Sequence, residues 1–320
     1  MADGGSVSVT RLEFPMDWPP GHVAAFLVDA DERILVDAGL PNTEASLRDG
    51  LAAADLAPAD VDHVVVTHPH PDHTGQIPTL LDAGDPTVHA PASAVDRLNR
   101  DADAVRERSR ANLEPAGLPE DQLDEAAETA VASLERARSL LPPDSVDDAV
   151  DPGEPLRVGG VEFDPIHTPG HQADHLCYAA TLGGDDVLFS GDMVLLPFRS
   201  ALLHDGYDDG YREAVPAFSD ALDALAARDV DRTYPGHGDV HARFAETVTR
   251  DRAKLNGRVD KVEAAVADGN RTAAAVVDAI QAGHDVRYVL PETMSILAHL
   301  VDAGRVERTV VDGTARYTVD

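Results

Sequence analysis

The order of apolar and polar segments indicates a mixed α/β chain. Two short apolar runs, 23–28 and 34–36, flank the polar turn 29–32, an arrangement typical of a β-hairpin. Residues 43–54 have the caps and the spacing of a helix. Residues 61–67, VDHVVVT, end in a continuous β-branched run that suits a strand buried on both faces. This first part of the chain therefore predicts strand pairs followed by strand-helix alternation.

The middle of the chain predicts a helical insertion followed by more strands. Residues 92–141 are rich in Ala, Arg, Glu and Leu, and Gly117-Leu118-Pro119 separates two helical stretches, so we expect a helical hairpin. Strand and helix signals then alternate, which indicates an α/β or α+β fold. The expected strands are 156–158, 161–166, 175–181, 187–189 and 230–234, with a helix at about 210–227.

The pattern changes again at residue 241. Because 320 residues exceed the usual size of one hydrophobic core, we predict a first domain at 1–240 and a smaller one at 241–320. Asp312-Gly313 between alternating β-formers is a strong hairpin signal. Three helices and a hairpin predict a winged-helix-like C-terminal domain. The expected elements are a helix ending at Ala267, one capped by Thr272, one from Pro291 to Asp302, and strands at 306–310 and 315–319.

The charge balance is strongly acidic. The chain has 58 acidic and 26 basic residues, a formal net charge of −32, 42 Asp against 16 Glu, and only two lysines, Lys254 and Lys261. This composition indicates adaptation to high salt, since at about 1 M salt the Debye length falls to roughly 3 Å and self-repulsion is screened. An ordinary acidic cytosolic protein is the alternative. The acidity therefore says more about the solvent than about the substrate.

Cysteine usage and hydropathy limit the kinds of site and location. Cys177 is the only cysteine, which rules out an intramolecular disulfide and a thiolate metal cage, so we expect it to be a buried small residue. Histidine and carboxylate side chains must bind any metal. The N-terminal segment lacks the features of a signal peptide, and no run of about 18 apolar residues occurs. We expect a cytoplasmic protein without a membrane partner.

A nine-residue segment at 67–75, THPHPDHTG, concentrates histidine and aspartate directly after an expected strand. His68 and His70 each precede a proline, which disfavours helical backbone and keeps the pair extended. Side chains two residues apart in extended backbone share a face, so both imidazoles can bind one ion. This spacing predicts a metal site.

Two more donors, Asp72 and His73, follow where the chain turns toward a helix that we expect to begin near Thr74. They can therefore point to a second ion beside the first. Gly75 permits a close approach of the backbone at this turn. Solvated loop residues are a poor explanation for so dense a cluster, and metal binding is the better interpretation.

Three later segments each place one donor after an apolar strand and a glycine. They are TPGH with His171, SGD with Asp192 and PGHG with His237. In sheets with helical crossovers, binding sites form in the crevice beyond the strand ends, so these loops can converge. Each segment alone is weak evidence, but together and in this order they are strong.

These segments, with Asp37 in VDAG at 36–39, resemble the five ordered motifs of the metallo-β-lactamase superfamily over roughly residues 20–240. The resemblance implies an αββα sandwich of two mixed sheets flanked by helices, with a binuclear metal site at one edge. It also implies that Asp37 orients a ligand histidine instead of binding metal. The implied ligands are His68, His70 and His171 at the first metal, Asp72, His73 and His237 at the second, and Asp192 bridging.

The implied chemistry is hydrolysis by two Zn²⁺ ions per chain. Two neighbouring cations lower the pKa of a bridging water and supply hydroxide near neutral pH. Asp72 can accept a hydrogen bond from this nucleophile and guide its proton, which makes it the expected catalytic residue. We predict a small ester, thioester or lactone as substrate. His175, His204, Tyr207 and Tyr211 are candidates to line the pocket, although strand-face or surface positions suit them equally.

Several alternatives remain open at this stage. Family members with a winged-helix-like tail include an endoribonuclease, but residues 257–320 carry seven basic and ten acidic side chains and no cationic stripe. Resemblance to glyoxalase II is weakened by Gln76, which replaces the usual second glycine. An iron persulfide dioxygenase would use one metal, and a non-enzymatic DNA-binding role would need basic contacts. The sequence leaves a homodimer open and places specificity in 92–150, with its arginine-dense part, and in 195–212.

Overall fold

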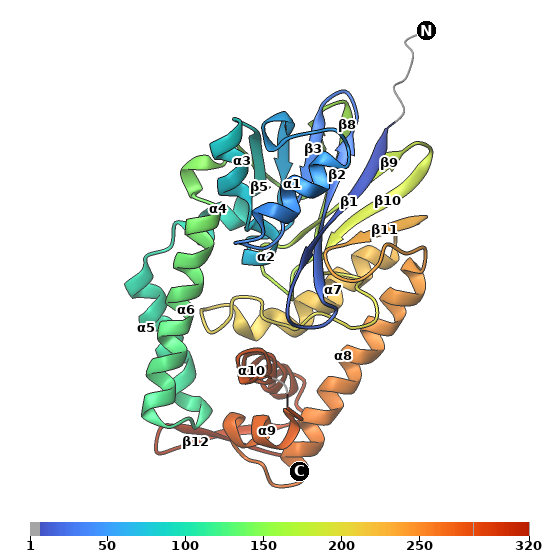
Figure 1. The fold of residues 1–320 in the computed structure, drawn as a ribbon. Coiled ribbons are helices and arrows are strands. Elements are labelled where there is room, and N and C mark those ends of the chain that lie inside the picture. The colour runs from blue at the N-terminus through green and yellow to red at the C-terminus, as the bar shows by residue number, and fades with distance from the viewer. Residues whose placement is uncertain (1–6, 284, 320) are drawn as a thin grey trace.

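Two mixed β-sheets form the centre of the molecule (Figure 1). The computed structural model describes residues 7–283 and 285–319. The first sheet has the order β1 (Ser8–Pro15), β2 (His22–Asp29), β3 (Arg33–Val36), β4 (His63–Val65), β5 (Thr87–Pro91) and β6 (Asp148–Val150). The second has the order β11 (Arg232–Pro235), β10 (Asp185–Gly191), β9 (Leu176–Leu182), β8 (Val161–His167) and β7 (Leu156–Val158). The predicted strand 61–67 is shorter than expected, and β1, β5 and β6 are additional.

Strand β2 shows how the sequence builds the layers, because almost all of it is buried on both faces. Ala24, Phe26 and Val28 belong to the apolar cluster between the two sheets, together with residues such as Phe163 and Phe189. The alternate residues 23, 25 and 27 belong to a second cluster. That cluster includes residues of α1 (Glu44–Ala52) and α3 (Ile77–Ala83), which cover the outer face of the first sheet.

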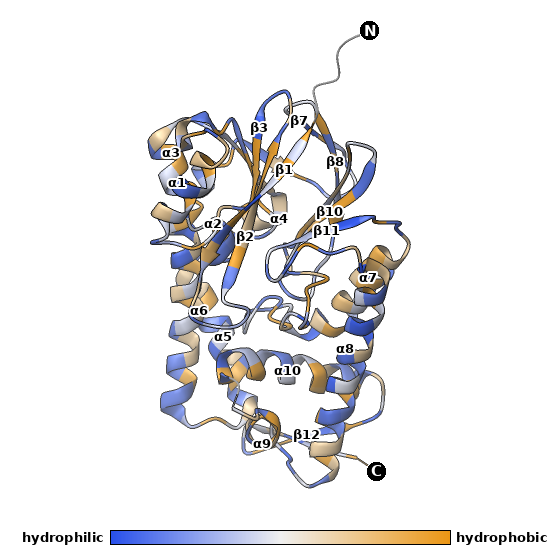
Figure 2. Ribbon diagram, turned by 45° about the vertical axis from the view of Figure 1, so that its right-hand side comes forward, coloured by the Kyte–Doolittle hydropathy of each residue, from blue (hydrophilic) through white to orange (hydrophobic). Residues whose placement is uncertain are grey.

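The outer face of the second sheet is covered by helices as well. Ile166 and Leu188 join an apolar cluster with α7 (Ala214–Ala226) and α8 (Phe244–Ala267). Apolar side chains therefore lie inside the sandwich. In Figure 2, hydrophobic residues are frequent along the strands, and hydrophilic residues recur along the helices that surround them. These four layers confirm the expected αββα metallo-β-lactamase fold.

The insertion consists of three helices, one more than predicted. They are α4 (Ala92–Leu98), α5 (Ala102–Leu113) and α6 (Glu120–Leu140). The extra boundary arises because the Asp101 side chain accepts a hydrogen bond from the backbone N–H of Ala104 and so caps a new helix. Gly117 reverses the chain between α5 and α6 with φ of 82°.

The C-terminal part contains α8, α9 (Ala273–Ile280), α10 (Val286–Asp302) and the hairpin β12 (Glu307–Val311) and β13 (Thr314–Thr318). Thr272 caps α9 as expected. The predicted start of the third helix at Pro291 was wrong. Asp285 caps the helix earlier by accepting from the N–H of Arg287, and Pro291 lies inside it.

The division into 1–240 and 241–320 stays a prediction, and residues 1–6, 284 and 320 of those ranges lie outside the described residues. The apolar cluster on the outer face of the second sheet continues through α8 into α9 and α10. Among the described residues, no helix is both long enough and apolar enough to span a membrane.

Two glycine substitutions test the packing behind the histidine-rich segment. A Cβ added at Gly75 would lie 2.1 Å from the backbone nitrogen of Pro41 and 2.5 Å from the carbonyl oxygen of Gly39, whereas a Cβ at the helical, exposed Gly257 meets nothing within 4 Å. We expect Gly75→Ala to lower the free energy of unfolding by about 3 kcal/mol. Gly257→Ala should raise it by about 0.5–1 kcal/mol. Denaturant unfolding measures both, and similar effects of the two variants would contradict this packing.

Candidate metal centre

The histidine-rich segment leaves β4 in extended backbone and turns directly into a short helix. His70 is the N-cap of α2 (Pro71–Thr74), with φ of −69° and ψ of 147°. The expected helix start near Thr74 was therefore three residues too late, because the fixed φ of Pro71 suits the first helical position. Asp72 and His73 consequently lie in the first turn of α2 and not ahead of the helix.

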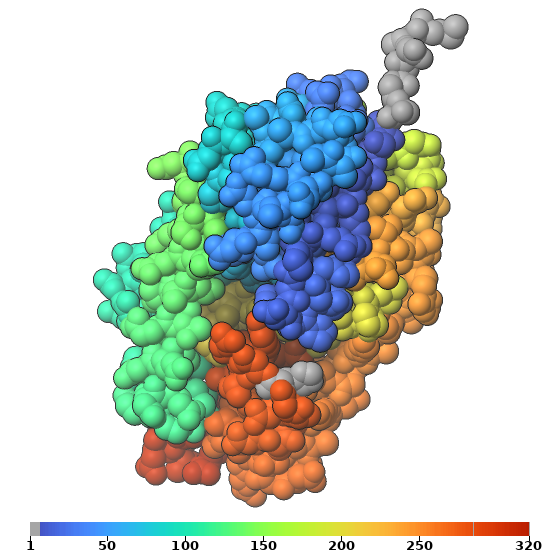
Figure 3. Space-filling model, in the orientation of Figure 1, coloured from blue at the N-terminus to red at the C-terminus, as the bar shows by residue number. Residues whose placement is uncertain are grey.

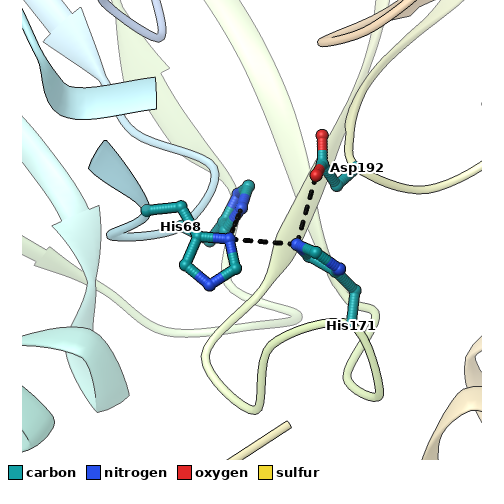
Figure 4. A group of neighbouring side chains, drawn as sticks. His68, His171 and Asp192 are labelled. Carbon is teal, nitrogen blue, oxygen red and sulfur yellow. Dashed lines mark hydrogen bonds and ion pairs between the residues drawn. The ribbon is translucent and has the colours of Figure 1, made fainter. Parts of the chain in front are cut away.

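The first group of donors contains His68, His70, His171 and Asp192. The Nδ1 of His70 lies 3.0 Å from the Nε2 of His68 and 3.0 Å from the Nε2 of His171. The Nε2 of His171 is 3.1 Å from the Oδ2 of Asp192. In Figure 4, the labelled His68, His171 and Asp192 point toward one another from three separate segments of the chain.

The second group of donors contains Asp72, His73 and His237. The Nε2 of His237 lies 3.2 Å from the Oδ2 of Asp72. Asp192 connects this group to the first, since its Oδ1 is 3.2 Å from the Nε2 of His73 and 3.3 Å from the Nε2 of His237. All seven side chains predicted from the sequence as ligands are thus brought together at one edge of the sandwich.

Three of these imidazoles are oriented by an acceptor on their outer nitrogen. The Nδ1 of His73 donates to the Oδ2 of Asp37 at 2.8 Å, and the Nδ1 of His171 donates to the carbonyl oxygen of Ala201 at 2.9 Å. The Nδ1 of His237 lies 3.3 Å from the carbonyl oxygen of His22. A nitrogen that donates must carry the proton, so the inward Nε2 of the same ring presents a lone pair.

Asp37 lies where the resemblance implied, behind a ligand histidine. Its Oδ1 accepts a hydrogen bond from the backbone N–H of Thr67 at 2.8 Å, and its own φ is 60°. The hydroxyl of Thr67 also donates to this carboxylate, and Asp37 is 3% exposed, so all of these bonds are made away from solvent. Asp37 therefore ties the end of β4 to the ring orientation of His73.

The donor set fits a bound cation. The Nε2 of His73 and the Oδ1 of Asp192 are buried and have no hydrogen-bond partner among the described residues. An unpaired buried polar atom is costly, and lone pairs and carboxylates that face one another repel. A divalent cation between them removes both penalties. Imidazole nitrogen and carboxylate oxygen are also the ligand types that zinc takes when thiolates are absent.

The pKa shifts of His70 and Asp192 match the protonation states that a metal requires. Burial lowers the pKa of His70 to about 3, and the neighbouring His171 contributes to this lowering. Burial alone would raise the pKa of Asp192, but His237 and His73 beside it hold that pKa well below its ordinary value. At neutral pH His70 is therefore a neutral ligand and Asp192 an anionic one. For His73 and His237, burial alone would lower the pKa, but the neighbouring carboxylates raise it, so a metal would have to displace a proton from these two rings.

The remaining candidate residues have different positions. His175 is buried behind the site, where its Nε2 accepts from the backbone N–H of Asp192 at 3.0 Å. His204 and Tyr207 line a cavity beside the metal edge, whereas Tyr211 is not part of the described lining. Cys177 is buried, as expected, and burial raises the pKa of its thiol to about 12.

The cavity beside His70 has a volume of about 500 Å³. Its walls come from α5 and α6 of the insertion, from the loop 203–208 and from the first turns of α10. Figure 3 shows the molecule hollowed between α6 and the C-terminal elements. The sequence indicated the insertion and the 195–212 loop as specificity regions, but it gave no signal for the wall that α10 provides.

The arginine-dense part of the insertion is largely neutralised within the cavity. Arg97 forms ion pairs with Asp174 and with Asp205, the latter at 2.5 Å. Arg100 lies 3.1 Å from Asp205 and 3.1 Å from Asp208. These carboxylates neutralise the charges of Arg97 and Arg100, which makes the two residues less suited to hold an anionic substrate.

The fold and the two joined donor groups define a metal-dependent hydrolase. This chain belongs to the metallo-beta-lactamase superfamily, whose family profile matches residues 18–237, more than half of the chain. Four of the five ordered motifs lie within the matched range, which ends at His237 of the fifth.

Three individual relatives are each 23–25% identical to this chain. The thioesterase pkgB of Emericella nidulans is 25% identical over 73% of this chain, and the match covers 51% of pkgB, so the chain spans about half of that relative's length. The atrochrysone carboxyl ACP thioesterase dmxR1 of a Cryptosporiopsis species is 23% identical over 90% of this chain and 77% of its own. A metallo-beta-lactamase family protein from Thermus thermophilus superposes with a TM-score of 0.79, 25% identity and 98% coverage of both chains.

Replacement of Asp37 tests whether the outer hydrogen bonds set the donor geometry. Asp37→Asn retains the shape but cannot accept from both Thr67 and His73 as a carboxylate does, so we expect zinc affinity to fall about 10–100-fold. The measurement is metal content after dialysis against a graded series of chelator concentrations. Asp62→Asn, at the opposite end of β4, where Asp62 accepts from the N–H of Arg33, is the control. Equal zinc retention in both variants would show that Asp37 does not support the site.

Proposed function

We propose that this chain is a binuclear zinc hydrolase that acts on thioesters of small acyl groups, with related esters and lactones as weaker substrates. The observation that carries the proposal is the pair of donor groups joined by Asp192, with His70 of the first group in the lining of the adjacent cavity. The names of two relatives, both thioesterases, favour a thioester over the other acyl compounds. In this assignment His68, His70 and His171 would hold one ion, Asp72, His73 and His237 would hold the other, and Asp192 would contribute to both.

Two zinc ions, when bound, supply an activated water nucleophile and polarise the carbonyl group of the substrate. Asp72 is the carboxylate suited to orient the attacking water, because its side chain is 19% exposed and that of Asp192 is 9% exposed. Burial alone would raise the pKa of Asp72, but His73 and His237 lower it well below its ordinary value. Asp72 is therefore ionised at neutral pH and able to accept a hydrogen bond from water.

The cavity favours an acyl group over a polynucleotide. Apolar side chains line much of it, including Val105, Leu134 and Leu203. Asp205 and Asp208 lie in the same lining and pair with Arg97 and Arg100, so these two guanidinium groups offer few contacts to a phosphodiester chain. This supports a small neutral acyl chain as the group that lies against α6, with its carbonyl carbon near His70.

Metal content and a substrate panel test the proposed activity. We expect about two zinc per chain, and hydrolysis of a thioester in high salt that is lost with a chelator and restored by zinc. His70→Ala should lower kcat/KM at least about 100-fold, because a ligand of the metal is removed. His299→Ala, in α10 and away from the donor groups, should retain activity.

The same panel includes a lactone, bis-nitrophenyl phosphate, single-stranded RNA and a persulfide with oxygen. Cleavage of RNA without thioester hydrolysis would favour the endoribonuclease alternative. One iron per chain with oxygen consumption would favour the dioxygenase alternative. Full activity in His70→Ala would overturn the metal mechanism altogether, and tight salt-dependent DNA binding without hydrolysis would indicate a binding protein.

A pair of serine substitutions tests whether the cavity holds the acyl group. Ser133 and Ser139 are both exposed on α6, but Ser133 lines the cavity and Ser139 does not. Ser133→Trp should raise KM for a long-chain thioester about 10-fold, because the indole occupies part of the acyl volume at a cost of about 1.4 kcal/mol. Ser139→Trp should leave KM unchanged. If the two variants behave alike toward both long and short acyl chains, the acyl group lies elsewhere.

A further inference from the structure

The loop 199–204 holds one of the proposed metal ligands at both its side chain and its backbone. The carbonyl oxygen of Ala201 accepts from the Nδ1 of His171 at 2.9 Å. The backbone N–H of His204 donates to the carbonyl oxygen of His171 at 2.8 Å, and that of Leu203 donates to the same oxygen at 3.2 Å. The position of this loop therefore determines the position of His171.

The loop is in turn held by a buried carboxylate on α10. Glu292 is 5% exposed, and its Oε2 accepts from the backbone N–H of Leu202 at 3.1 Å. Its Oε1 accepts from the Nη2 of Arg199 at 2.9 Å and from the Nε of Arg258 in α8 at 3.0 Å. Arg199 also donates to the carbonyl oxygen of Ser200 at 2.7 Å, so Glu292 holds the loop directly and through this arginine.

No helix or strand fixes residues 199–203 independently of these bonds. Side-chain hydrogen bonds, together with the backbone bond from Leu203 to His171, therefore fix the backbone of this segment. Loss of the carboxylate would leave the N–H of Leu202 without its acceptor and two partly buried guanidinium charges without their partner. Either penalty is large enough to displace the loop.

We propose that Glu292 is a positioning residue of the metal centre. It holds the loop 199–204 so that the carbonyl oxygen of Ala201 keeps the proton on the Nδ1 of His171 and the Nε2 of that ring faces inward. Glu292 belongs neither to the donor groups nor to the described lining of the cavity. This inference rests on the proposed zinc centre and makes α10 part of its support.

If Glu292 only stabilised the fold, its replacement would lower metal affinity no more than any other substitution that destabilises α10 equally. Helix α10 is anchored by its apolar face, where Ile296, Leu297 and Leu300 are fully buried in the cluster shared with α8 and α9. Glu292 bonds instead to the loop and to Arg258. Its replacement should therefore change metal affinity by more than a comparable loss of stability explains.

The test compares zinc affinities by competition with a chromophoric chelator in the full chain, alongside thermal unfolding of each variant. Glu292→Ala should weaken one of two zinc sites about 10–100-fold, the range typical of residues that orient metal ligands. Glu292→Gln keeps an acceptor for the N–H of Leu202, so its zinc affinity should lie between those of Glu292→Ala and the wild type. Leu297→Ala, a buried residue of the same helix, is the stability-matched control and should lower the Tm without selective loss of zinc.

A second readout follows the ring itself. In zinc-loaded protein, ¹⁵N spectra of the histidine side chains should report a loss or shift of the Nδ1–H signal of His171 in Glu292→Gln. Unchanged affinity and an unchanged signal in both Glu292 variants would overturn the inference, as would an equal loss of zinc in Leu297→Ala. A wild-type chain that binds no zinc would instead overturn the proposed function, so the two failures are distinguishable.

Discussion

Mutual repulsion among seven electron-pair donors is the constraint on which this structure depends. Five imidazoles and two carboxylates meet at one edge of the sandwich, and the strands must all end there to deliver them. Hydrogen bonds from three of the rings to Asp37, Ala201 and His22 turn these imidazoles so that their lone pairs converge. This convergence raises the repulsion among the donors when no cation is bound, and it would raise their affinity for a cation. A divalent metal would remove this repulsion among the donors.

Much of this site could be predicted from local sequence, because local chemistry specifies it. Four of the seven donors lie within six residues, and Pro69 and Pro71 fix the backbone that separates them. His171, Asp192 and His237 each follow a run of apolar strand residues, and the ends of such strands meet in one crevice. The pattern of apolar residues predicted only an α/β or α+β fold, and the αββα sandwich was predicted from the family resemblance that the motifs carry.

The parts that were missed depend on contacts between distant residues. Strand β1 is only partly buried and β6 has three residues, so neither has a clear apolar period. Pro291 suggested a helix start, but the cap of Asp285 and the tertiary packing of α10 override it. Nothing in the sequence links Leu202 to Glu292, which are 90 residues apart. The domain division, the zinc identity and the adaptation to high salt stay predictions, as their evidence is compositional or inherited from the resemblance.

The cavity has two unlike helical walls. Helix α6 faces it with small and apolar side chains and with Arg136. Within the part of the chain that the structure describes, α6 makes no hydrogen bond to the loop that holds His171, so residues there can be exchanged at little cost to the metal centre. Helix α10 lines the cavity with Tyr288 and Pro291, and its next residue, Glu292, holds that loop. Diversification of substrate range in this lineage is therefore expected to accumulate along one wall, while the other evolves slowly because it serves two selective demands at once.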